Sequence, residues 1–108
     1  MDDGQQQYIH QVLEAYRKTP GTTGTIRHPD RVLAAQLFHR GISVRMIENA
    51  FVLAATRRMV RPADAHPLGT IRSLAYFVPI IEEVQELRVS PDYFQYLRYK
   101  LARITPPR

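Results

Sequence analysis

The sequence contains no cysteine, and this absence removes several kinds of chemistry at once. There can be no disulfide framework, no thiolate nucleophile and no zinc site ligated by cysteine. Long apolar runs are also missing, because no stretch approaches the ~18 consecutive apolar residues that a membrane helix requires. The N-terminal segment MDDGQQQ is acidic and polar, unlike a secretory signal. We therefore expect a protein without a membrane span, in the cytoplasm.

At 108 residues, the chain has room for one domain with a modest core. Its four histidines fall on separate predicted elements without an i,i+4 pair, so we expect no metal site and no cofactor. Glu82, Glu83 and Glu86 match a solvated helix face better than a catalytic carboxylate pair. Ser43 and Ser73 lack a histidine neighbour in sequence and are expected to cap helices. These observations predict no catalytic residues and a non-enzymatic protein.

Hydrophobic periodicity predicts an all-α fold, a single bundle of about five helices. We place the helices at about residues 6–18, 29–40, 44–60, 73–88 and 91–104. Pro79 interrupts the fourth of these, which it either opens after a preceding turn or kinks. Ser90, Pro91 and Asp92 are typical of a helix start, and no stretch alternates in the manner of a strand.

The second and third predicted helices form a central pair with the spacing of a helix-turn-helix. Gly41 suits the left-handed residue that ends one helix, and Ser43 suits the cap of the next. On the outward side of the third helix, Arg45 and Asn49 could pair with guanine and adenine edges. Apolar residues on more than one face, and an acidic Glu48 there, instead favour a core helix. We therefore assign base reading to Arg45 and Asn49 only as a secondary hypothesis.

Positive charge is concentrated in the second half of the chain. The formal net charge is +5, and most of the basic residues are arginine. Up to Ala54 there are six basic and five acidic side chains, whereas from Ala55 onwards there are nine basic and five acidic. A GC-rich genome would also produce an arginine excess, but the uneven distribution favours a polyanionic partner.

Residues from about Tyr8 to Val84 resemble the DnaD-like replication-accessory domains of bacteria and phages. One matching motif is RGIS at residues 40–43, followed by IENA at 47–50. The other is SLAYFVPIIEEV at 73–84, which is similar to the family's tyrosine-x-x-x-isoleucine-x-x-x-tryptophan segment with Tyr76 and Ile80 in register. Val84 stands where the tryptophan would be, and Pro79 departs from the family pattern. The resemblance implies DNA binding near this segment and along the C-terminal helix that follows it.

The C-terminal helix interleaves tyrosines with cations, the combination that single strands need for base stacking and phosphate contact. The alternative is that the tyrosines cover the core and the cations are solvated. The predicted nucleic-acid contacts are Arg57, Arg58, Arg61, Arg72, Tyr76, Tyr96, Arg98, Tyr99, Lys100 and Arg103.

Two functional hypotheses remain open on the sequence. The first is a DNA-binding accessory protein, for single- or double-stranded DNA, in the replication of a chromosome, phage or mobile element. The second is a protein–protein adaptor, which acts as a homodimer or with a replication-protein partner through helix 6–18 and the segment 71–87. The chain could also be one part of a larger initiator.

Overall fold

The computed structural model describes residues 3–62, 64–87 and 91–104, and within them the fold is all-α. The helices are α1 (Asp3–Lys18), α2 (His28–His39), α3 (Val44–Met59), α4 (Val78–Leu87) and α5 (Pro91–Ile104), with a 3-10 turn, η1 (Leu74–Phe77), directly before α4. Outside the helices, the only β-type pairing of the described residues is an isolated bridge between Thr22 and Ile71. No helix in these ranges is long and apolar enough to cross a membrane.

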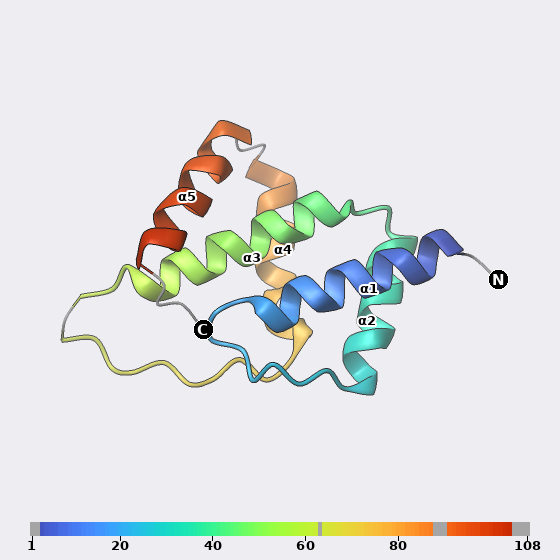
Figure 1. Cartoon of the computed structure of the whole chain (residues 1–108), viewed down its shortest axis with the longest axis horizontal. Helices are drawn as coiled ribbons and strands as arrows, with labels where there is room; N and C mark the ends of the chain where they lie inside the picture. The colour runs from blue at the N-terminus through green and yellow to red at the C-terminus, as the bar shows by residue number, and fades with distance from the viewer. Residues whose placement is uncertain (1–2, 63, 88–90, 105–108) are drawn as a thin grey trace.

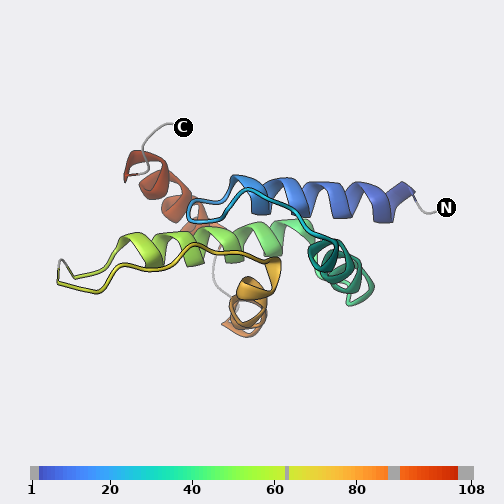
Figure 2. The same ribbon diagram turned by 90° about the horizontal axis from the view of Figure 1, so that it is seen from below.

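Helix α3 lies at the centre of the molecule. It contacts α1, α4 and α5, and in the two views α5 and α4 lie on different sides of it (Figures 1 and 2). Its buried side chains therefore point in several directions, from Ile47 and Phe51 to Leu53 and Ala55. Where α1, α3 and η1 meet, the rings of Tyr16, Phe51 and Phe77 pack edge to face, with centroids 4.7 to 6.5 Å apart. This arrangement confirms a core helix at the position predicted for one.

The turn between α2 and α3 follows the sequence prediction. Gly41 has φ +74°, and the N–H groups of Gly41 and Ile42 donate to the carbonyls of Phe38 and Leu37. This is the Schellman arrangement, which satisfies the last carbonyls of α2. The Ser43 hydroxyl accepts a hydrogen bond from the Met46 N–H at 3.1 Å and so caps α3.

The fourth predicted helix is split, and its cap differs from the prediction. Pro79 is the second residue of α4, where its missing N–H costs nothing, so it opens the helix and does not kink it. The Ser73 hydroxyl makes no capping bond, so the expected Ser73 cap is wrong. Instead, Asp30 Oδ1 accepts the Leu74 N–H at 2.9 Å from 44 positions earlier in the chain. The predicted helix end at 88 and the Ser90 cap lie outside the described residues.

Asp30 thereby joins two parts of the fold. Its other oxygen, Oδ2, accepts the Arg27 N–H at 2.9 Å and closes the first turn of α2. The side chain is only 2% exposed, although it carries a carboxylate. Because both oxygens accept backbone N–H groups, the buried carboxylate is satisfied by the backbone.

Candidate nucleic-acid interface

Helix α5 packs on α3 through one face and presents tyrosines on another. Phe94 and Leu97 are buried against the core, whereas Tyr93, Tyr96 and Tyr99 are 47%, 57% and 62% exposed. We call these three residues the tyrosine row. Successive members are three positions apart, which is about 4.5 Å along a helix axis. Tyr93 was not among the predicted contacts, although the same three-residue spacing runs back to it in the sequence.

Two cations continue the tyrosine row into the last turns of α5. The Arg103 guanidinium donates to the Tyr99 hydroxyl at 3.2 Å and lies 5.7 Å from the centre of its ring. This contact fixes a cation beside an exposed aromatic face. Lys100 is exposed one turn after Tyr96 and faces the neighbouring helix α3.

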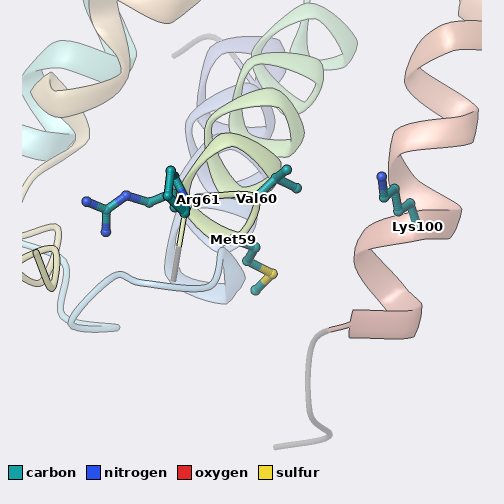
Figure 3. Close-up of a pocket in the computed structure, with 5 residues that line it drawn as sticks. Met59, Val60, Arg61 and Lys100 are labelled. Carbon is teal, nitrogen blue, oxygen red and sulfur yellow. The ribbon is translucent and has the colours of Figure 1, made fainter. Parts of the chain in front are cut away.

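A groove runs between α3 and α5 beside the tyrosine row. We call it the α3–α5 groove. Its volume is about 380 Å³ and its lining residues are Leu53, Thr56, Arg57, Val60, Tyr93, Tyr96, Leu97 and Lys100. A second hollow of about 710 Å³ shares Val60 and Lys100 with it and is also lined by Met59, Arg61 and Pro62. Figure 3 shows the Val60 side chain directed toward Lys100, whereas Arg61 extends away from it.

Arg57 lies at the rim of this groove, but its charge is already paired. Its two terminal nitrogens donate to Glu83 of α4, with Nη1 to Oε2 at 2.7 Å and Nη2 to Oε1 at 2.5 Å. The hydrogen bond from Arg57 lowers the pKa of Glu83 and correspondingly raises the pKa of Arg57. The sequence predicted only a solvated side chain at Glu83. The structure shows that its carboxylate accepts two hydrogen bonds from Arg57, a predicted DNA contact.

A second group of predicted residues lies near η1, away from α5. Arg58 donates to the Gly69 carbonyl at 2.6 Å and to the Tyr76 hydroxyl at 3.4 Å. Its guanidinium also lies 5.8 Å from the centre of the Tyr76 ring. These contacts tie the segment after α3 to η1, and Arg72 is exposed directly after the bridged Ile71. The structure thus divides the predicted contacts between two sides of α3.

Arg98 differs from the other cations of α5, because it turns toward α3. Its Nη2 donates to the Asn49 side-chain oxygen, and its Nη1 is buried without a hydrogen-bond partner among the described residues. Burial lowers the pKa of Arg98, and the nearby charge of Arg45 lowers it further, with Glu48 opposing both. Arg98 is therefore not placed for the phosphate contact expected of it. Asn49, a secondary candidate for base reading, is half-buried and its side-chain oxygen is taken by Arg98. Arg45, the other candidate, is exposed.

The chemistry of this surface is that of aromatic rings, apolar side chains and cations. The described residues contain no group of three or more histidine, aspartate or glutamate side chains that could hold a metal ion. Comparisons with protein-family models, with curated proteins and with solved structures find no match to this chain.

Proposed function

We propose that this chain is a non-enzymatic DNA-binding accessory protein, of the kind that acts in replication of a chromosome, phage or mobile element. The observation that carries the proposal is the tyrosine row with Lys100 and Arg103, exposed beside the α3–α5 groove. Exposed rings provide stacking surfaces for bases, and the cations neutralise phosphates. The resemblance to DnaD-like domains supports the same function. In the segment that carries this resemblance, Tyr76 is exposed, whereas Val84, which takes the place of the tryptophan, lies in the core.

The number of available cations sets how strongly binding should depend on salt. Of the seven expected phosphate contacts, Arg57, Arg58 and Arg98 contact partners on other segments of the protein, whereas Arg103 contacts only Tyr99 of its own helix among the described residues. The cations that remain are Arg61, Arg72, Lys100 and Arg103. With at most about four phosphate contacts, log K should fall with log salt with a slope no steeper than about −3 to −4. This is a moderate dependence, weaker than that expected if all seven cations contacted phosphate.

Fluorescence polarisation with labelled single-stranded and duplex DNA, at about 50 and about 200 mM salt, tests the proposal. We expect binding at the lower salt that weakens when Lys100→Gln and Arg103→Gln are combined. The matched control combines Arg27→Gln with Arg31→Gln, two exposed arginines at the start of α2. No binding to either DNA at low salt would reject the proposal.

A protein–protein adaptor is the second candidate, supported by the apolar lining of the hollow at the end of α3. Val60 is 59% exposed there beside Met59 and Pro62. The sequence also suggested segment 71–87 for such contacts. Leu74, Phe77 and Ile81 of this segment lie in the core and are not available to a partner. Light scattering distinguishes the candidates: a stable homodimer without DNA affinity would favour the adaptor.

A further inference from the structure

The α3–α5 groove is lined by a mixture of aliphatic, aromatic and charged side chains. Leu53, Val60 and Leu97 supply aliphatic surface, and Tyr93 and Tyr96 stand along the α5 side. The Thr56 hydroxyl donates to the Val52 carbonyl at 2.7 Å, so its proton is used within α3. The charged groups of the lining are Arg57 and Lys100. A ligand for this groove therefore needs a flat or apolar body with an anionic group attached to it.

We infer that the groove binds one unstacked base of a nucleic-acid strand, and that the protein consequently prefers single strands to duplexes. This inference rests on the proposed function and names the form of nucleic acid that its site takes. A base is a flat ring system, and its phosphate provides the anion for Lys100. In a duplex both faces of each base are covered by its neighbours, so only an unpaired base can enter the groove or stack on the tyrosine row.

The charges beside the groove lead to the same preference. Lys100 and Arg103 are the cations of α5 that are exposed on the side of the tyrosine row, while Arg57 is held by Glu83. Two phosphate contacts on a single strand give a salt slope of only about −1.4. Attraction to phosphates alone would then bind DNA weakly, whichever form it takes. Stacking has to provide much of the affinity, and stacking is available only to unpaired bases.

The test compares an oligothymidine of about 20 nucleotides with a duplex of the same length. In wild-type protein we expect the single strand to bind at least about tenfold more tightly. Val60→Glu places a carboxylate at the exposed mouth of the groove and should weaken single-strand binding about tenfold or more. Val32→Glu is the matched control, because Val32 is 43% exposed on α2 and does not line the groove, and it should bind as wild type does.

Stacking is tested separately at Tyr96, whose side chain is 57% exposed and lines the groove. Tyr96→Ala should weaken single-strand binding by about tenfold or more, whereas Tyr96→Phe keeps the ring and should bind nearly as well as wild type. Circular dichroism verifies that each variant keeps its helix content. A uridine RNA of the same length shows which sugar backbone binds better.

Different failures have different meanings. Duplex binding that equals or exceeds single-strand binding would overturn this inference and leave the proposed DNA-binding function standing. Val60→Glu and Tyr96→Ala proteins that bind the single strand as wild type does would also overturn it. No binding to any of the nucleic acids would reject the inference and the proposed function together.

Discussion

Two tyrosines on the buried side of α1 differ in what their hydroxyl groups contact. The Tyr8 hydroxyl donates to the Ile42 carbonyl at 2.6 Å and links α1 to the turn before α3. The Tyr16 hydroxyl is buried and has no hydrogen-bond partner among the described residues. The ring of Tyr16 contributes to the aromatic cluster with Phe51 and Phe77, so its packing is favourable while its hydroxyl is not.

Removing the two hydroxyls should therefore have opposite effects. Tyr8→Phe leaves the Ile42 carbonyl without its partner and should lower the free energy of unfolding by about 1–2 kcal/mol. Tyr16→Phe removes an unsatisfied polar atom and should leave stability unchanged or raise it by up to about 1 kcal/mol. Urea denaturation at neutral pH measures both. Equal losses in the two variants would show that the hydrogen bond to Ile42 contributes nothing specific.

Tyr8 also makes the stability depend on alkaline pH. Burial raises its pKa from 10.0 to about 12, because the folded protein disfavours the phenolate. A folded-state pKa above the unfolded one means that this stabilisation is complete below about pH 10 and is lost as the pH rises toward about 12. Denaturation at about pH 9 and about pH 11.5 should show a smaller decline in Tyr8→Phe than in wild type. Burial raises the pKa of Tyr16 as well, so some decline should persist.

At the scale of the elements, the turn between α2 and α3 depends on one glycine. Gly41 has φ +74°, yet a Cβ there would meet nothing within 4 Å. Gly41→Ala should therefore cost about 1–2 kcal/mol through backbone strain alone. Gly69→Ala is the control, because its surroundings are equally open and it has no positive φ. A thermal melt that shifts equally for both variants would contradict this account of the turn.

Asp30 connects α2 with η1, and its replacement should loosen both elements. Asn in its place keeps one acceptor oxygen for two N–H groups, those of Arg27 and Leu74. Asp30→Asn should lower the free energy of unfolding by about 1–3 kcal/mol, since a buried donor loses its partner. Hydrogen exchange should show faster exchange of the Leu74 amide in the variant. Asp64→Asn, which changes an exposed aspartate, should alter neither measurement.

The elements themselves were largely predictable, because caps and periodicity are local signals. Gly41, Ser43 and Pro79 each act within a few residues of their own position. Contacts between distant residues have no such signal, so the sequence could not show that Asp30 replaces Ser73 as the cap of η1. The pairing of Arg57 with Glu83, 26 positions apart, was hidden for the same reason. The tyrosine row could have been extended to Tyr93 from the sequence, because the spacing of three residues is unbroken.

At the scale of the whole molecule, the position of α3 determines which charges remain available. Because α3 contacts α1, α4 and α5, cations along it meet partners from several elements. Arg57 meets Glu83 of α4, and Arg58 meets Gly69 and Tyr76. The excess positive charge of the second half is therefore less available than its count suggests. Under the proposed DNA-binding function, Glu83 of α4 then acts as a restraint on Arg57.

Breaking the ion pair between Arg57 and Glu83 should increase the affinity for single-stranded DNA. Glu83→Gln removes the carboxylate that holds Arg57 and leaves a free cation at the rim of the α3–α5 groove. We expect single-strand affinity at about 50 mM salt to rise several-fold, and the salt slope to steepen by about 0.7 for one added phosphate contact. The cost to stability should be small, because the ion pair lies at the surface, where solvent screens it.

Glu86→Gln separates this effect from a change of net charge. Glu86 is exposed on the same helix, so its substitution adds the same formal charge without releasing Arg57. We expect affinity and salt slope close to those of wild type, measured by fluorescence polarisation across a salt series. An equal gain in both variants would mean that only overall charge matters. An unchanged affinity in both would mean that DNA does not approach this rim, and binding would then have to be sought on the Arg58 and Tyr76 side of α3.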